Sequence, residues 1–326
     1  MTKNDRSKLE AFSFLPDGVP RTEEQLFADI ERGHVFRLAD CYVKFLFGKQ
    51  ERAPLFLDLL NAVIYPGGER AFTTIQYVDR EISPVRIDGK GSRLDLLCSL
   101  DDGEQVNVEF QVRVEPDYVK RSLYYWALLH GGQLEKGMLY WSVNRTISVN
   151  ILGFDIFEDE HDFRNSYSIR NDRNGNPLCD DLSIIYIELK KYLLAMKSGR
   201  KPVNKLEKWL CYFAGLEGDE MTRVAESEPM IEQAVGMEKM FLMNYEQRLA
   251  YIMNLKTMMD EANHDASIER AAKEEGLKEG REEGLEQGRG EERLKMLHNL
   301  LDMGLDVEKI SAVTGFSADE ITNLNR

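Results

Sequence analysis

The spacing of hydrophobic positions changes along the chain and predicts a mixed α/β part followed by a helical part. Residues 35–47 and 54–64 carry hydrophobic side chains at helical spacing; Gly48 ends the first segment and Pro54 opens the second. Strand-like patterns occupy residues 73–78, 92–100, 105–114, 139–143, 147–154, 163–169 and 182–189. An aromatic-rich helix is predicted at residues 118–134, and from about Lys205 onward the pattern is helical throughout.

The segment Gln105–Val114 alternates strictly between hydrophobic and polar residues. Its polar members, which share one face of the predicted strand, are Asn107, Glu109, Gln111 and Arg113. The turn sequence Asp-Asp-Gly at residues 101–103 joins this strand to the preceding one, which contains Asp95. A hairpin of this kind can bring the carboxylates of Asp95 and Glu109 side by side.

Two carboxylates on rigid strands suit a hard cation such as Mg²⁺, which takes oxygen ligands and retains several waters. The cation lowers the pKa of a bound water and offsets charge on a phosphodiester in the transition state. Gln111 shares the face of Glu109, so its amide can hydrogen-bond an attacking water. The simpler interpretation is an ordinary solvent-facing polar side of an antiparallel pair, so the hairpin alone does not decide between them.

The composition of the 326 residues allows a hydrophobic core and excludes several classes of protein. Hydrophobic residues make up 43% of the chain, and no apolar run approaches the roughly 18 residues that span a bilayer. The first residues lack the apolar core of a signal peptide, so we expect a cytoplasmic protein. The cysteines form no CxxC pair and the histidines no HExxH, which argues against a zinc site or a disulfide framework.

The net charge of −15 argues against a nucleic-acid partner, because non-specific DNA binding depends on lysine and arginine. The excess of acidic over basic residues is unevenly distributed along the chain, however. Residues 1–130 carry 17 basic and 21 acidic side chains, whereas the remainder carries 25 and 36. Most of the acidic excess therefore lies outside the hairpin region, and a bound cation would reverse the sign of its carboxylates locally.

The segment 268–293 is of low complexity, with glycine at residues 276, 280, 284 and 288 among glutamate, lysine and arginine. Period four keeps these glycines near one helical face, where a second helix could approach closely; the alternative is a weakly stable solvated helix. Residues 296–324 then predict two or three short amphipathic helices. Their spacing is similar to a helix-turn-helix, but the acidic last helix favours a packing or dimerisation unit.

Several further motifs follow one another along the chain. They are Asp40-x-x-x-Lys44-Phe45-x-Phe47-Gly48, Leu57-x-x-Leu60-Asn61, Arg93-Leu94-Asp95, Asn107-Val108-Glu109-Phe110-Gln111, Arg121-x-x-Tyr124-Tyr125, Gln133-Leu134-x-x-Gly137 and Ile187-Glu188-Leu189. In this order and spacing they resemble the recombination-promoting nuclease (Rpn) family, also described as PD-(D/E)xK nuclease family transposases. The resemblance covers about residues 36–290.

The resemblance implies a restriction-endonuclease-like α/β core, in which a mixed central sheet is flanked by helices, with a C-terminal all-helical extension. It also implies hydrolysis of the DNA backbone with Mg²⁺ or another divalent cation such as Mn²⁺ or Ca²⁺. By motif, Asp95 matches the metal-binding aspartate and Glu109 the second acidic ligand. Gln111 stands where the wider superfamily has lysine, which makes the catalytic set Asp95, Glu109 and Gln111.

Four residues outside this set match supporting motifs of the same family. Asp40 and Lys44 match the N-terminal helix motif; being four residues apart, they share a helical face and could reach the site or pair with each other. Arg121 and Tyr124 match the helix after the catalytic hairpin, where Arg121 could contact phosphate.

The patterns divide the chain into an N-terminal arm (1–31), a nuclease-like domain (32–200), a helical extension (201–267), the glycine- and glutamate-rich helix (268–293) and a small helical unit (294–326). The first hypothesis is a Mg²⁺-dependent DNA endonuclease, associated with recombination or mobile elements, that forms a homo-oligomer through its C-terminal helices. The second is a catalytically weak or inactive nuclease fold that serves as an oligomeric assembly module. It is motivated by the net charge and by the neutral Gln111, which removes one cation from the developing charge. RNA is a third substrate class, although no RNA-binding motif accompanies it.

Overall fold

The computed structural model describes residues 23–78, 81–82, 92–93, 96–101, 103–113, 117–134 and 136–324. The chain forms two compact units, residues 1–260 and residues 261–326. The finer division into five segments stays a prediction. In the part of the chain that the structure describes, no helix is both long enough and apolar enough to cross a membrane.

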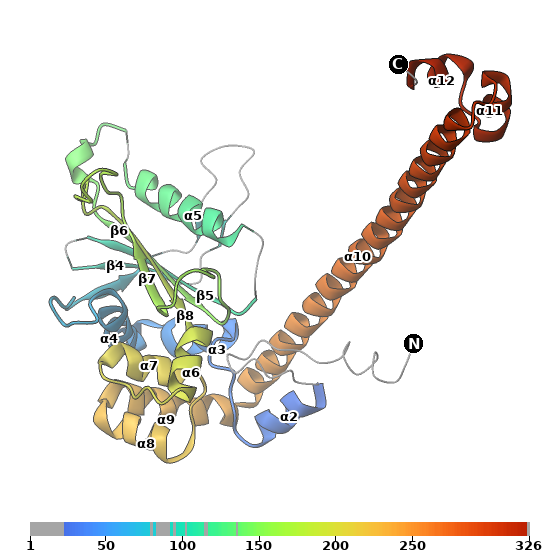
Figure 1. The fold of residues 1–326 in the computed structure, drawn as a ribbon. Helices are drawn as coiled ribbons and strands as arrows, with labels where there is room; N and C mark the ends of the chain where they lie inside the picture. Colours follow the sequence, from blue (N-terminus) through green and yellow to red (C-terminus); the bar gives the residue numbers. More distant parts are fainter. Residues whose placement is uncertain are drawn as a thin grey trace. The chain divides into compact units, whose positions relative to one another are not determined.

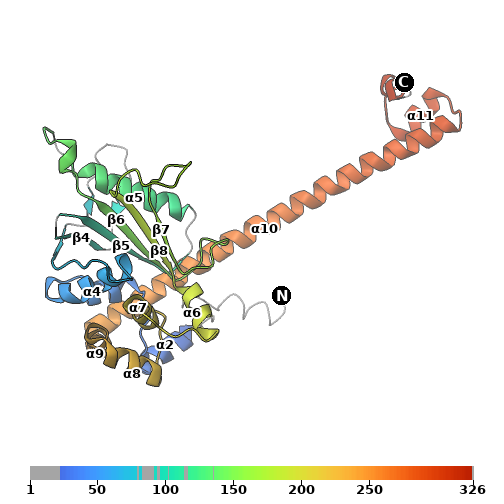
Figure 2. The same cartoon turned by 60° about the vertical axis from the view of Figure 1, so that its left-hand side comes forward.

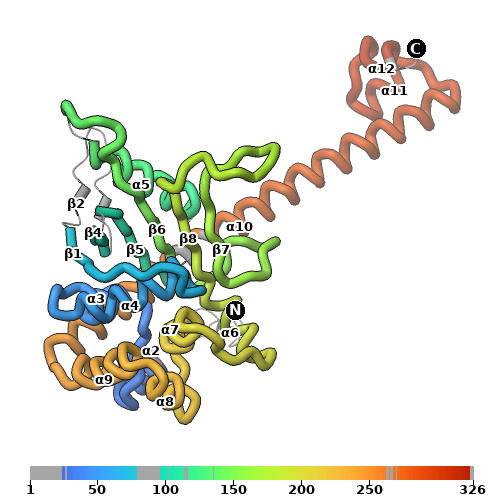
Figure 3. The backbone as a smooth tube through the Cα atoms, turned by 90° about the vertical axis from the view of Figure 1, so that its left-hand side faces the viewer, coloured from blue at the N-terminus to red at the C-terminus, as the bar shows by residue number. Residues whose placement is uncertain are grey.

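A six-stranded mixed sheet forms the centre of the first unit. Its strands, in spatial order, are β1 (Ile75–Tyr77), β4 (Leu96–Leu100), β5 (Gln105–Gln111), β6 (Thr146–Leu152), β8 (Leu182–Glu188) and β7 (Arg164–Tyr167). Strands β5, β6 and β8 are parallel, and the outer pairs are antiparallel. Figure 3 shows these strands side by side. A separate two-stranded ladder joins β2 (Glu81–Ile82) to β3 (Ser92–Arg93). The predicted mixed α/β core is confirmed.

Helices cover both faces of the sheet, so the parallel strands are buried on both sides (Figures 1 and 2). One face carries α5 (Tyr118–Gly132). The other carries a helical layer that includes α3 (Asp40–Phe47), α4 (Ala53–Ile64), α7 (Lys205–Phe213) and α9 (Pro229–Met243). Shorter elements complete the unit: α2 (Glu23–Glu31), η1 (Gln50–Arg52), α6 (Leu189–Lys197) and α8 (Gly218–Ser227).

The main hydrophobic core lies between the sheet and the helical layer. The β5 residues Val106, Val108 and Phe110 all point into it, as their alternation predicts. Phe110 packs against Phe213 of α7 and Phe47 of α3, with ring centroids 5.6 Å and 6.2 Å apart. The polar residues between them therefore face α5 on the opposite side of the sheet.

The turn before β5 follows the sequence prediction. Gly103 adopts a positive φ of 83°, a conformation that favours glycine. The Asp101 carboxylate accepts hydrogen bonds from the backbone N–H groups of Thr73 (2.8 Å) and Thr74 (2.5 Å) and from both threonine hydroxyls. The hydrogen bonds from Thr74 and Thr73 lower the pKa of Asp101 to about 2. The turn is thereby fixed to the segment that leads into β1.

Three sequence predictions differ from the structure. The segment 92–100, predicted as one strand, contributes β3 to the separate ladder with β2 and β4 to the central sheet. The first predicted helix begins at Asp40 rather than Val35, because the backbone of residues 35–39 turns before the helix and Ala39 is extended at the N-cap. The predicted strand at residues 139–143 is wrong. These residues form a single 3₁₀ turn, η2 (Tyr140–Ser142), closed by the hydrogen bond from Ser142 N–H to the Leu139 carbonyl (2.9 Å).

The second unit contains the end of the long helix α10 (Tyr245–Asp302) together with α11 (Val307–Thr314) and α12 (Ala318–Leu324). A small core of Leu297, Ile310 and Ile321 joins the three helices. The predicted series of short C-terminal helices is confirmed. The glycine-rich part of α10 is exposed, and a Cβ added at residue 276, 280, 284 or 288 would meet no atom within 4 Å.

Candidate functional site

Glu109 lies on β5 and is 4% exposed, on the face that α5 covers. Its Oε1 accepts a hydrogen bond from Asn107 Nδ2 (3.1 Å), and its Oε2 accepts a longer one from Gln111 Nε2 (3.5 Å). The two amides come from the neighbouring positions on the same face of the strand. A buried carboxylate is thus held between two neutral donors, which fix its orientation.

A row of polar side chains crosses the sheet at the level of Glu109. The parallel register places Glu109 beside Asn150 of β6 and Asn150 beside Tyr186 of β8. Helix α5 bonds to this row at two points: Tyr118 donates to Asn150 Oδ1 (2.9 Å), and the Ser122 and Tyr186 hydroxyls share a hydrogen bond. Burial raises the pKa of Tyr186 further above neutral, so its hydroxyl is available as a hydrogen-bond donor.

Arg121 belongs to the same part of α5, between Tyr118 and Ser122, and is half-buried. Its guanidinium carbon lies 4.8 Å from the centre of the Tyr118 ring and 5.9 Å from that of Tyr125. These contacts keep a permanent cation on the part of α5 that covers the Glu109 row. Tyr124, by contrast, is 50% exposed and turns away from the sheet.

Asp40 and Lys44 bind each other. The Lys44 ammonium lies 2.5 Å and 2.6 Å from the two carboxylate oxygens of Asp40, across one turn of α3. Helix α3 belongs to the layer on the face opposite α5 (Figure 1). Of the two roles that the sequence left open for this pair, mutual pairing is observed.

Asp95 lies outside the described residues, which resume at Leu96. The antiparallel register between β4 and β5 joins Leu96 to Val108, the residue before Glu109. Among the residues that the structure describes, no group of three or more histidine, cysteine, aspartate or glutamate side chains could hold a metal ion. The described part of the site therefore contributes one carboxylate, that of Glu109.

A family model described as PD-(D/E)XK nuclease family transposase matches residues 37–267. The chain belongs to this family. Comparisons with curated proteins and with solved structures gave no match. The predicted family is thereby confirmed, and so is the predicted fold, since the mixed sheet flanked by helices is that of a PD-(D/E)XK nuclease.

Membership in the PD-(D/E)XK nuclease family indicates a nuclease-type function, a hydrolase and a DNA partner. Nucleases of this family generally use divalent metal ions. The described residues fit such an ion in chemistry: the Glu109 carboxylate is buried beside Asn107, whose Oδ1 is buried and accepts no hydrogen bond within the described part of the chain. Both are the hard oxygen donors that Mg²⁺ prefers.

Glu188, from the motif at residues 187–189, has a structural role in this nuclease fold. It is fully buried, and its Oε1 accepts the backbone N–H groups of Ile156 (2.7 Å) and Phe157 (3.1 Å). Its Oε2 accepts from Lys191 Nζ (2.8 Å) and Asn165 Nδ2 (3.3 Å). Four donors occupy the carboxylate, so Glu188 connects the loop after β6 to the start of α6.

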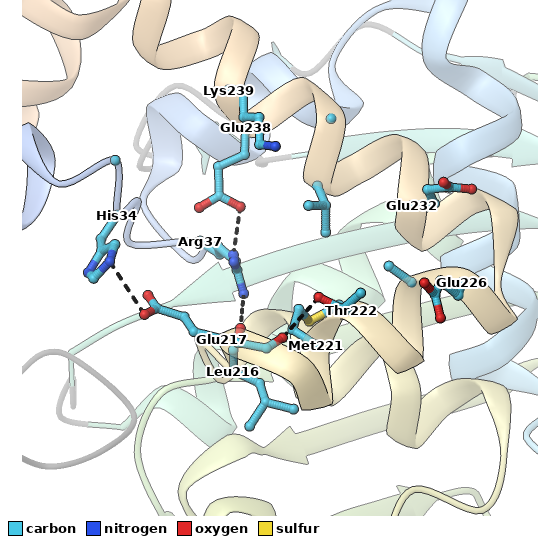
Figure 4. Close-up of a pocket in the computed structure, with 15 residues that line it drawn as sticks. His34, Arg37, Leu216, Glu217, Met221, Thr222, Glu226, Glu232, Glu238 and Lys239 are labelled. Carbon is cyan, nitrogen blue, oxygen red and sulfur yellow. Dashed lines mark hydrogen bonds and ion pairs between the residues drawn. The ribbon is translucent and has the colours of Figure 1, made fainter.

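A separate pocket of about 560 Å³ lies in the helical layer, lined by residues of the α2–α3 loop, α8 and α9 (Figure 4). The buried pair Arg37–Glu238 (2.9 Å) crosses it, and His34 lies 3.4 Å from Glu217 at its side. Arg37 also donates to the carbonyls of Tyr212 (2.7 Å) and Leu216 (3.3 Å). These bonds connect the loop before α3 to α7 and α9, so the pair stabilises the helical layer.

Sequence reasoning missed the polar row of Asn150, Ser122, Tyr118 and Tyr186. One signal was available, because the segment Thr146–Leu152 alternates polar and hydrophobic residues just as β5 does. The aromatic pattern of α5 gave no comparable signal. Only the three-dimensional register shows that its hydroxyls meet the Glu109 row.

Proposed function

We propose that the chain is a metal-dependent DNA endonuclease in which Asp95 and Glu109 hold a divalent cation. The observation that carries the proposal is the buried Glu109 carboxylate on β5, oriented by Asn107 and Gln111 beneath a helix that carries Arg121. The proposal requires Asp95 to lie across from Glu109, the position that follows if the β4–β5 register continues for one more residue.

In this proposal each residue of the site has one task. When bound, the cation would act as a Lewis acid that lowers the pKa of a water molecule and offsets the charge of the phosphate. Glu109 and Asp95 orient oxygen atoms toward it. Gln111 orients the attacking water through its amide, and Arg121 binds a non-bridging phosphate oxygen of the DNA. Helix α5 excludes bulk water from the Glu109 row, which strengthens these interactions.

The biological setting that we propose is DNA recombination or the movement of mobile elements, in line with the transposase description of the family. The reaction is hydrolysis of a phosphodiester bond. Cutting both strands of a duplex with one centre per chain calls for two copies of the chain, which agrees with a homo-oligomer.

The first test is to incubate supercoiled plasmid with the purified protein, with Mg²⁺ or Mn²⁺ and separately with EDTA, alongside Asp95→Ala. We expect nicked or linear plasmid only with wild type and metal, because the metal lacks a ligand in the variant. Equal cleavage by wild type and Asp95→Ala would contradict the assignment of the centre. No cleavage with either metal would favour the assembly module.

A second function, self-association through α10, has its own support. Four glycines lie in the exposed stretch of α10 at residues 276, 280, 284 and 288. Each costs a helix roughly 1 kcal/mol relative to alanine, so this stretch is weakly stable by itself. We propose that it associates with the same stretch of a second copy, where the glycines allow close approach of the helices.

Replacing Gly276, Gly280, Gly284 and Gly288 by alanine distinguishes the two interpretations of this helix. If the glycines are packed against a second helix, the added methyl groups will push the helices apart and raise the dissociation constant by about tenfold or more. If the helix is solvated, the four alanines will raise its helicity and leave the assembly unchanged. Sedimentation velocity and circular dichroism measure the two effects. A wild-type protein that is monomeric at every concentration would contradict self-association.

A further inference from the structure

The segment that joins α5 to β6 exposes two aromatic rings at its tip. Tyr140 is 86% exposed and Trp141 is 82% exposed, both on the turn η2. This turn is the green loop at the upper left of Figure 1, beyond the end of α5. The other tryptophans are shielded, since Trp209 is fully buried and Trp126 is half-buried. Because the two rings are adjacent, they form a contiguous exposed apolar patch, which is typical of an interaction site.

Hydrogen bonds hold the base of this tip in one conformation. Gln133, after α5, donates through Nε2 to the Asn144 carbonyl (3.0 Å) and to Thr146 Oγ1 (2.9 Å), and accepts from Asn144 N–H (2.9 Å). The turn itself is closed by Ser142, whose N–H and hydroxyl both donate to the Leu139 carbonyl. The rings are therefore presented on an ordered support, which lowers the entropy cost of binding.

Lys136 is the exposed cation beside the tip. Residues 136–154 contain no aspartate or glutamate, although Glu135 precedes them, and Arg145 of this segment is paired with the Glu104 carboxylate (3.6 Å). Proteins bind single-stranded nucleic acid with aromatic rings, on which bases stack, beside basic groups that meet the phosphates.

The segment that carries the tip is joined to the strand of the proposed centre. The Arg145 carbonyl accepts the N–H of Gln105, the first residue of β5, at 2.9 Å, and Glu109 lies further along the same strand.

Two other partners fit these features less well. A stable protein interface needs about 800 Å² on each side. Together with the adjoining Met138 (43% exposed) and Leu139 (61% exposed), the two rings offer at most about 700 Å² at roughly 150–250 Å² for each full side chain, which falls short of this area. An anionic membrane attracts clusters of basic residues, whereas the tip has one exposed cation, Lys136, and the chain is strongly acidic.

We propose that Tyr140 and Trp141 stack on an unpaired base of single-stranded DNA whose backbone continues to the Glu109 centre. The inference rests on the proposed nuclease function and specifies its substrate class. DNA with an unpaired strand beside the cut, such as a flap or a gapped duplex, binds better than an intact duplex because its bases are free to stack.

Tryptophan fluorescence tests the proposal directly, because Trp141 is the exposed tryptophan. The protein is titrated in EDTA, where no cleavage is needed, with oligothymidylate and with an abasic oligonucleotide of the same length. We expect oligothymidylate to quench the emission and the abasic strand to leave it nearly unchanged, because only bases stack. Equal quenching by both would overturn the proposal, since phosphate alone would then suffice.

Variants measure the contribution of the rings to binding. With labelled oligothymidylate and anisotropy as the readout, Trp141→Ala and Tyr140→Ala should each weaken binding about fivefold to a hundredfold. Trp141→Phe should retain most of the affinity. Tyr245→Ala, which removes an exposed aromatic ring on α10, is the matched control and should have no effect. Unchanged affinity in both alanine variants would contradict stacking.

The remaining outcomes assign the tip elsewhere or separate the two proposals. A blue shift of the emission with anionic vesicles, or dissociation of an oligomer in Trp141→Ala, would overturn the proposal in favour of a membrane or a second copy. Quenching and ring-dependent binding without metal-dependent cleavage of either the plasmid or a flap duplex would leave stacking supported and the nuclease proposal rejected. Metal-dependent plasmid cleavage without quenching would support the nuclease proposal and reject stacking.

Discussion

Replacing Glu109 by glutamine is expected to reduce metal-dependent DNA cleavage by at least about a hundredfold while the protein remains folded. Glutamine has the shape of glutamate, and its carbonyl oxygen can still accept the hydrogen bond from Asn107. The substitution removes the negative charge that holds the cation. The effect should therefore appear in catalysis and in metal affinity, measured by plasmid cleavage and by calorimetric titration with Mn²⁺.

The matched control for this variant is Glu104→Gln in the same hairpin. Glu104 is 7% exposed, and its carboxylate pairs with Arg70 (2.9 Å) and Arg145 (3.6 Å) at the opposite end of β5 from Gln111. The Glu104→Gln variant loses the same charge as Glu109→Gln, but away from the centre, so its cleavage activity should change little. If Glu109→Gln cleaves DNA and binds metal as well as the wild type does, the Glu109 carboxylate does not hold the cation.

The alternation of residues 105–111 was sufficient to predict which side chains of β5 enter the core. Val106, Val108 and Phe110 lie in the core as expected, which leaves Glu109 and Gln111 on the other face. Period two is dictated by the strand backbone itself, so a sequence pattern reports it directly. The sequence did not predict that α5 would bury this polar face, because that depends on how a crossover helix packs on the sheet.

Predictions failed where one local hydrogen bond or a distant partner decides the conformation. Residues 139–143 are hydrophobic enough for a strand, but the Ser142 hydroxyl closes a turn instead. Arg37 fits the helical pattern of residues 35–47, yet it lies before the helix because its partners are on α7 and α9. Pairings about 175 and 201 residues apart along the chain leave no periodic signal in the sequence.

Arg37→Ala is expected to destabilise the protein by about 3–5 kcal/mol, because it leaves the Glu238 carboxylate buried without its cation. The two side chains are 8% and 9% exposed and 2.9 Å apart. The variant also removes the donor to the Tyr212 carbonyl. Urea unfolding monitored by circular dichroism measures the loss. Arg32→Ala breaks the exposed Arg32–Asp29 pair (2.8 Å) and, as the control, should cost at most about 1 kcal/mol.

The loss in Arg37→Ala should also depend on pH. Burial raises the pKa of Glu238 in the wild type, and the Arg37 guanidinium opposes that rise. Without Arg37 the folded-state pKa lies further above the unfolded one, so the folded protein favours the protonated carboxyl. The stability of the variant should then be closest to that of the wild type near pH 5, and the difference should grow as the pH rises toward 8.

Replacing both partners by hydrophobic residues, Arg37→Met with Glu238→Leu, removes the buried charge and should recover most of the stability. A deficit that is independent of pH, or that persists undiminished in the double variant, would assign the role of Arg37 to its carbonyl contacts instead.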